Sequence, residues 1–378
     1  MRACTIAAAL SLSLSIAACG EPEPGAAEDV GATDTAAEPE PDVRGDHLDV
    51  YLDEGIALCG GQLAAYDRFI ERAYTFWTGT APPSDFRISV NVSDTSPCRT
   101  GEHSCAQAST VSLVRQFGEY HELVHAIQYS VDGASARTLD EGLATALGAD
   151  YPFTAMPPYS ADPDILLSNS PVSSDYVPLG LFVRFLIDNH GIEAARGLVQ
   201  ALVQPGTPTP EEIERQFELA FGEPLAGTWA EFAAQPRCAY DFPFCGDQNP
   251  IVLPYTLDGL DCGDPDVLGY SAPSLAAPPN VPYSPSKLLH LQVDEPTWIN
   301  VDVEHASVGI GQCGDCSEQT LLSSGGTATG IINFELDQPG TYVFIVRALS
   351  VEEPARLSIA AGCLPDHPVA TLPAQCPE

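Results

Sequence analysis

Two histidines and a glutamate lie close together in a pattern that can bind and use a metal ion. Segment 118–128 reads Gly-Glu-Tyr-His-Glu-Leu-Val-His-Ala-Ile-Gln and contains His121, Glu122 and His125. Positions four apart lie on the same face of an α-helix, so both imidazoles can reach one ion, and zinc suits this donor pair. Glu122 directly follows His121 and can take a proton from a water molecule at that site. We therefore predict a zinc site on a helix, with Glu122 as general base.

A downstream Glu-Gly segment extends this pattern. Segment 139–144 reads Leu-Asp-Glu-Gly-Leu-Ala. With the His-Glu-x-x-His segment it resembles the gluzincin branch of the zincin metallopeptidases, in which a Glu in a Glu-Gly-x-Ala stretch of the next helix is the third zinc ligand. The resemblance covers about residues 46–235 and implies Glu141 as that ligand, with Asp140 as a partner of a ligating His. The metzincin branch needs a third His soon after the second, and segment 126–135 contains none.

Glu141 also has a purely structural interpretation. Thr138 and Glu141 have the spacing of a capping box, in which the Glu side chain bonds the backbone N–H of the Thr and starts the helix. Small residues on the same helix face favour the metal interpretation because they allow close approach to the first helix; they are Ala144, Thr145 and Gly148. If Glu141 were only a cap, the third ligand would be Asp140 or His190, although a His beside Gly at a helix end more often serves the helix dipole.

The chemistry implied by the resemblance is zinc-dependent hydrolysis of a peptide or protein substrate by metal-activated water. Glu122 would remove the proton of that water and pass it to the leaving amine. Such a site needs a donor for the developing oxyanion. Tyr176, just before an apolar helix expected from Leu179, is our candidate, with plain aromatic packing as the alternative. The alternative function is a non-catalytic binding or adhesion protein, tethered to the cell envelope, on a zincin scaffold.

The N-terminus has the features of a lipoprotein signal peptide. A basic start is followed by an apolar run over 5–18 and by Ile-Ala-Ala-Cys, which resembles the bacterial lipobox. We expect residues 1–18 to be removed and Cys19 to carry lipid, with an ordinary signal peptide as the alternative. Residues 19–45 are rich in Glu, Asp, Pro and Ala and predict a disordered linker. The expected location is the bacterial cell envelope, with the lipid anchor in the outer membrane, on its periplasmic or surface face.

The charge of the chain limits its partners. The sequence has 52 acidic and 15 basic residues, a net charge of -37. So acidic a surface repels phosphate groups, which argues against nucleic acid and anionic lipid head groups as partners of the folded part. Solubility is the simplest reason for the acidity.

The cysteine count predicts disulfides in an exported chain. Twelve cysteines are present, and setting aside Cys4 and Cys19 leaves an even number that allows up to five bridges. Spacing favours three local pairs, which are Cys98 with Cys105, Cys238 with Cys245, and Cys313 with Cys316. The remaining cysteines, Cys59, Cys262, Cys363 and Cys376, would pair among themselves. The Cys-Gly-Asp-Cys segment 313–316 could instead be a redox or metal motif, but a loop disulfide is favoured.

Hydrophobic periodicity predicts an α+β fold in two domains. Mixed helices and strands are expected over 46–245, where their order resembles the small mixed sheet and helices of a zincin-like domain, and a disulfide-containing β-sandwich domain is expected over 246–378. The expected strands of the first domain are 47–53, 86–92 and 106–114, and its expected helices are 62–77, the 118–128 helix, 139–148, 179–189, 192–203, 210–221 and 225–234. The expected strands of the second are 287–293, 298–303, 330–336, 341–346 and 356–360.

Two further segments of these domains each have two interpretations. Segment 109–114 resembles the sheet-edge strand along which zincins bind an extended substrate, with an ordinary edge strand as the alternative. Four aspartates of the second domain could hold calcium, although unpaired acidic loop residues are commoner; they are Asp258, Asp261, Asp264 and Asp266.

Overall fold

The computed structural model describes most of the chain after the predicted linker. The described residues are 39–93, 98, 104–114, 119–149, 163–168, 171–204, 206–246, 249–271, 285–314, 316, 330–349 and 353–362. The predicted signal peptide, Cys19, most of the predicted linker, Cys363 and Cys376 lie outside these residues.

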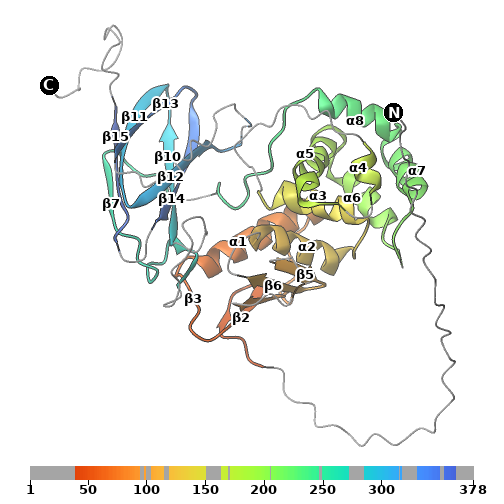
Figure 1. Cartoon of the computed structure of the whole chain (residues 1–378), viewed down its shortest axis with the longest axis horizontal. Coiled ribbons are helices and arrows are strands. Elements are labelled where there is room, and N and C mark those ends of the chain that lie inside the picture. Colours follow the sequence, from red (N-terminus) through yellow and green to blue (C-terminus); the bar gives the residue numbers. More distant parts are fainter. Residues whose placement is uncertain are drawn as a thin grey trace, which may run out of the picture. The chain divides into compact units, whose positions relative to one another are not determined.

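The first part of the fold is built on a five-stranded mixed sheet with the order β1-β2-β4-β6-β5. Its strands are β1 (Val43–Arg44), β2 (Leu48–Leu52), β4 (Ile88–Ser93), β5 (Ser104–Gln107) and β6 (Thr110–Val114). Strands β2, β4 and β6 are parallel, and β1 and β5 run antiparallel to their neighbours. Every second residue of β4 is buried, as expected for a sheet covered on one face. Helices α1 (Gln62–Thr78) and α2 (Glu119–Val131) lie beside this sheet (Figure 1).

A hairpin replaces the single strand expected over 106–114. Strands β5 and β6 pair antiparallel, and Ala108 between them has a φ of 50°. Turns with positive φ are usually announced by Gly or Asn, so this one leaves no signal in the sequence. Because β6 pairs with β4 on its other side, the prediction that 109–114 forms a sheet edge is wrong. Among the described strands, that edge is β5.

Helices make up the rest of this part. They are α3 (Arg137–Leu147), α4 (Asp164–Leu167), α5 (Ser173–His190), α6 (Ile192–Ala201), α7 (Pro210–Phe221) and α8 (Leu225–Ala233). Helix α7 has its predicted bounds, and the Thr209 side chain accepts a hydrogen bond from the N–H of Glu212 at 3.3 Å. Helix α5 begins six residues before the predicted Leu179 and runs through Pro178, so Tyr176 lies inside the helix.

The second part of the fold is a β-sandwich, as predicted (Figure 1). One sheet has the order β12-β14-β10-β8 and the other β13-β11-β15-β7. Their strands are β7 (Tyr255–Asp258), β8 (Val267–Leu268), β10 (Ser286–Val293), β11 (Thr297–Glu304), β12 (Ala306–Gln312), β13 (Gly330–Leu336), β14 (Gly340–Ala348) and β15 (Arg356–Ala361). Strands β7, β8 and β12 were not predicted from the sequence. A short antiparallel pair, β3 (Ala57–Leu58) with β9 (Tyr270–Ser271), joins segments far apart in the chain.

Four disulfides lie within the described residues, and they correct two predicted pairs. Cys98–Cys105 forms as predicted, and Cys59 pairs with Cys262. The predicted local pairs Cys238–Cys245 and Cys313–Cys316 are wrong, because the bonds are Cys238–Cys316 and Cys245–Cys313. The reason is packing: the segment around Cys245 covers an outer patch of the β10 and β14 strands, and Cys313 follows β12 at the same patch.

The disulfides indicate an extracytoplasmic protein, because such bonds persist in oxidising compartments. Within the part of the chain that the structure describes, no helix has the length and apolarity needed to cross a membrane.

Candidate metal centre

Three side chains from two helices converge on one point. Helix α2 places His121 and His125 one turn apart on a single face, and α3 brings Glu141 to them. The Glu141 Oε2 atom lies 3.1 Å from His121 Nε2 and 3.3 Å from His125 Nε2. Zinc with ligand bonds of 2.0–2.2 Å in a tetrahedron needs donor atoms about 3.4 Å apart. All three residues are buried, so this donor set fits a single metal ion.

The contacts of Glu141 exclude the capping-box alternative. Helix α3 begins at Arg137 with Ala136 as its N-cap, so Thr138 lies inside the helix, and its hydroxyl donates to the carbonyl of Leu166 at 2.8 Å. Burial alone would raise the pKa of Glu141. Hydrogen bonds from the two histidines outweigh burial and hold that pKa well below its usual range. Glu141 therefore remains a carboxylate that faces the histidines.

Small residues let the helices meet closely, as the sequence predicts for α3. A Cβ at Gly148, where α3 ends, would lie 2.8 Å from the backbone N and Cα of His121. On the neighbouring helix, a Cβ at Gly180 would lie 2.4 Å from Cγ2 of Thr145. Neither position has space for a methyl group, so α3 lies against both α2 and α5 at backbone distance.

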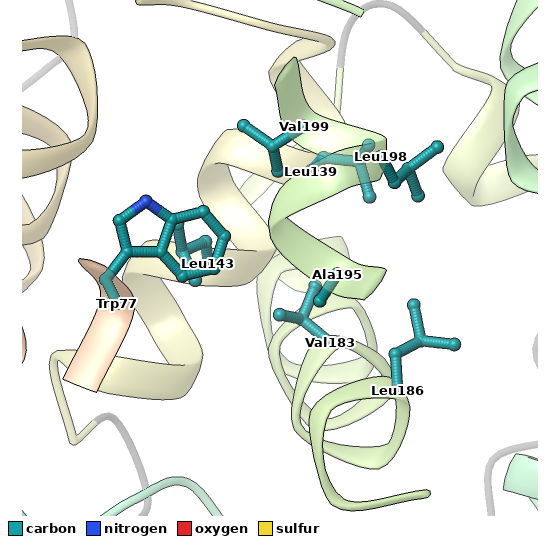
Figure 2. A pocket seen from close by; sticks show the side chains of 8 residues that line it. All are labelled: Trp77, Leu139, Leu143, Val183, Leu186, Ala195, Leu198 and Val199. Atoms are coloured by element: carbon teal, nitrogen blue, oxygen red, sulfur yellow. The ribbon is translucent and has the colours of Figure 1, made fainter. Parts of the chain in front are cut away.

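The opposite face of α3 is anchored in an apolar environment. Figure 2 shows Leu139 and Leu143 in a pocket where α1, α3, α5 and α6 meet. Its other lining residues are Trp77, Val183, Leu186, Ala195, Leu198 and Val199. Because residues two positions apart point to opposite sides of a helix, this anchoring fixes the direction of Glu141.

Asp140 differs from its predicted role as a hydrogen-bond partner of a ligating His. Its carboxylate accepts hydrogen bonds from the Gln128 amide and from the backbone and hydroxyl of Ser135. Burial raises its pKa, against the effect of these bonds and of the nearby His125 charge. Among the described residues, Nδ1 of His125 has no hydrogen-bond partner. The hydrogen bonds of Asp140 thus hold the loop between α2 and α3.

Tyr176, the predicted oxyanion donor, lies beside His121. Its ring is nearly parallel to that of His121, with ring centres 5.9 Å apart. Arg137 and Glu141 lie close enough to its hydroxyl group to influence the pKa of Tyr176. Burial, with the Glu141 charge, raises the pKa of Tyr176 to about 12, so the phenol is a proton donor at neutral pH.

Glu122 is the most exposed member of the motif. It is partly exposed, whereas His121 and His125 are buried. Two residues that the sequence analysis missed also lie here. Tyr129 stacks on His125 with ring centres 5.4 Å apart, and burial together with the Asp140, Glu141 and Glu122 charges raises its pKa. Arg137 is the second residue that was not predicted. Its position four residues before Glu141 is the one sequence signal that could have indicated its contact with this site.

The remaining metal candidates do not form sites. His190 packs against the Phe221 and Phe185 rings, which removes it as a third ligand. Asp241 lies near Cys245 and Cys313, but those two sulfur atoms form a disulfide and cannot bind a metal as thiolates.

Three of the four aspartates considered for calcium have separate partners. Asp258 pairs with Arg356, and Asp266 pairs with Lys287. Asp261 accepts a hydrogen bond from the Gly263 N–H. Within the described residues they do not gather into a group that could hold an ion.

Comparison with known proteins adds little. No protein-family model and no curated protein matches the sequence. One solved structure with similarity is the pre-peptidase C-terminal domain of a collagenase from Bacillus anthracis, with 15% identity, covering 30% of this chain and 93% of that chain at a TM-score of 0.19. Another is the M60 catalytic domain with two CBM51 domains of Clostridium perfringens ZmpB, with 8% identity, covering 79% of this chain and 56% of that chain at a TM-score of 0.22. At such scores, the function must be inferred from the site itself.

Proposed function

We propose that this protein is a zinc-dependent peptide hydrolase. The observation that carries the proposal is the convergence of His121 Nε2, His125 Nε2 and Glu141 Oε2, with Oε2 3.1 and 3.3 Å from the two nitrogens. Two imidazoles and one carboxylate on two adjoining helices form a three-ligand set that leaves a fourth position open, as catalytic zinc sites do. When bound, zinc would supply Lewis acidity that polarises a carbonyl group and makes water easier to deprotonate.

The residues around the ligands have distinct roles in this proposal. Glu122, partly exposed and next to His121, takes the proton of the attacking water and returns it to the leaving amine. Tyr176, protonated at neutral pH, donates a hydrogen bond to the oxyanion that develops on the substrate. Gln128 and Ser135 hold the Asp140 carboxylate and thereby the loop that orients α3.

An extended peptide is the substrate form that suits the sheet. Strand β5 pairs with β6 along one side, and an edge strand can hold an extended chain through backbone hydrogen bonds. Because β5 replaces 109–114 as the edge, the pairing role proposed for that segment passes to Ser104–Gln107.

Metal removal tests the function directly. We expect purified protein to contain one zinc per chain and to cleave casein or gelatin, to lose cleavage with a chelator, and to regain it on adding zinc. Cleavage that persists in the metal-free protein would refute the proposal. A zinc-loaded protein without cleavage of any of a panel of peptides would instead favour the binding or adhesion function.

The lipid anchor is a separate proposal that depends on the sequence around Cys19. Cys19→Ala should release the protein from the membrane fraction of the expressing bacterium. Unchanged membrane partitioning of this variant would rule out the anchor without affecting the hydrolase proposal.

A further inference from the structure

Arg137 occupies a position that is unfavourable for helix stability. It is the first residue of α3, where the helix dipole is positive and a cation is disfavoured. The pair that it makes with Glu141 has the basic residue first, which is the weaker order for charges four apart. Local stability therefore does not explain an arginine here, and residues that break local rules tend to lie at functional sites.

The contacts of Arg137 divide the Glu141 carboxylate into two halves. The Arg137 Nε atom lies 3.4 Å from Oε1 of Glu141, whereas both histidine nitrogens contact Oε2. One oxygen of Glu141 therefore faces the metal ligands, and the other faces a cation.

Exposure indicates that this ion pair does not serve stability. The Arg137 side chain is 43% exposed and that of Glu141 is 11% exposed. Ion pairs with one solvated partner contribute little to the free energy of unfolding. The fixed positive charge and directed N–H group can nevertheless determine which carboxylate oxygen is available to an ion.

We infer that Arg137 is a positioning residue that makes Glu141 a one-oxygen metal ligand. By holding Oε1, it prevents the carboxylate from turning both oxygens toward the ion, so the ion keeps three protein donors and an open position. The inference rests on the proposed function, since it concerns the metal that the site would hold.

Cobalt(II) in place of zinc tests the inference, because its visible absorption weakens as coordination rises above four. The full mature chain is loaded with one cobalt per chain as wild type, Arg137→Met, Arg137→Lys and Arg215→Met. Arg215 is a matched control, since it pairs with Glu212 on an exposed surface. We expect Arg137→Met to bind cobalt with weaker and shifted visible absorption bands. Arg137→Lys and Arg215→Met should both keep the wild-type spectrum.

The outcomes separate the two proposals. If wild-type protein binds no cobalt and no zinc, the proposed function fails. If wild type and Arg137→Met both bind one cobalt with the same spectrum, the metal site stands and the role of Arg137 is refuted. Thermal unfolding of the metal-free proteins gives a further readout: a merely structural Arg137 would lower the melting temperature on substitution, whereas we expect no decrease.

Discussion

The candidate metal centre and the β-sandwich are held together by different means. Around the metal centre, helices α2, α3 and α5 touch at backbone distance through Gly148 and Gly180, and buried polar groups bond across them. The sandwich depends on strand pairing and an alternating apolar core, and disulfides join its segments to distant parts of the chain. The helices around the candidate metal centre should therefore be sensitive to a single added methyl group, and the sandwich to reduction of its disulfides.

The largest expected effect separates chemistry from structure within the metal centre. Glu122→Gln keeps both histidines and the shape of the side chain but removes the base, so hydrolysis should fall by roughly two to four orders of magnitude. Zinc content, measured by atomic absorption, should remain at the wild-type level. Near-normal turnover in a zinc-loaded variant would contradict the mechanism.

Removing a long-range disulfide should weaken the sandwich without altering metal binding. The double variant Cys245→Ser with Cys313→Ser removes a bond that spans 68 residues, and we expect a loss of about 2–4 kcal/mol in the free energy of unfolding. Removing Cys98–Cys105, which spans only 7 residues, is the control and should cost less because it closes a shorter loop. A parallel loss of zinc affinity in the first variant would show that the two regions are not independent.

A single methyl group should disturb the metal centre. Gly148 has a φ of -73°, which any residue can adopt, so Gly148→Ala acts through clashes of its methyl group with the carbonyl oxygen of Ala144 and with the His121 backbone. We expect a loss of about 1–3 kcal/mol and weaker zinc binding, measured by calorimetry.

Gly197→Ala is the matched control for that substitution. Gly197 lies within α6, and a Cβ there meets no other atom within 4 Å. It should stabilise the protein by up to about 1 kcal/mol, since Ala is the better helix former. Equal behaviour of the two variants would argue against close packing at His121.

The smallest expected effect concerns acid sensitivity at the end of α2. The Asp132 carboxylate accepts hydrogen bonds from Trp77, Arg196 and Gln200. Burial raises its pKa, but these bonds outweigh it and hold the pKa below its usual value. The stabilisation is therefore complete above the unfolded pKa of about 4 and is lost as the pH falls through the folded pKa.

Asp132→Asn isolates this contribution. The variant should be less stable than wild type by about 1 kcal/mol at pH 7, measured by urea unfolding, and the difference should shrink below pH 4. A difference that stays constant down to pH 2 would show that the charge of Asp132 is not responsible.

The centre of the site was predictable because its chemistry is local in sequence. His121, Glu122 and His125 lie within five positions on one helix, and the helical period alone places the histidines together. Glu141 required the resemblance to gluzincins, and its pairing with the histidines depends on tertiary packing. Arg137 gave no comparable signal, because an arginine four residues before a glutamate is common on helix surfaces.

The errors occurred where tertiary structure overrides a local rule. A proline usually marks the end of a helix in a sequence-based prediction. Helix α5 nevertheless continues through Pro178 and carries Tyr176. Ala108 turns the β5–β6 hairpin without a glycine. The two wrong disulfide predictions have the same origin, because they paired the cysteines that are closest in sequence, whereas the fold brings other cysteines together.

The pairing of Cys238 with Cys316 and of Cys245 with Cys313 has a consequence for biosynthesis. During export we expect the short non-native loops 238–245 and 313–316 to close first, because loop closure is easiest over few residues. The native bonds can form only after the strand that precedes Cys313 has emerged and reached the earlier segment. We therefore expect maturation to involve exchange between thiols and disulfides, and the yield of native protein to depend on a disulfide isomerase in the expressing host.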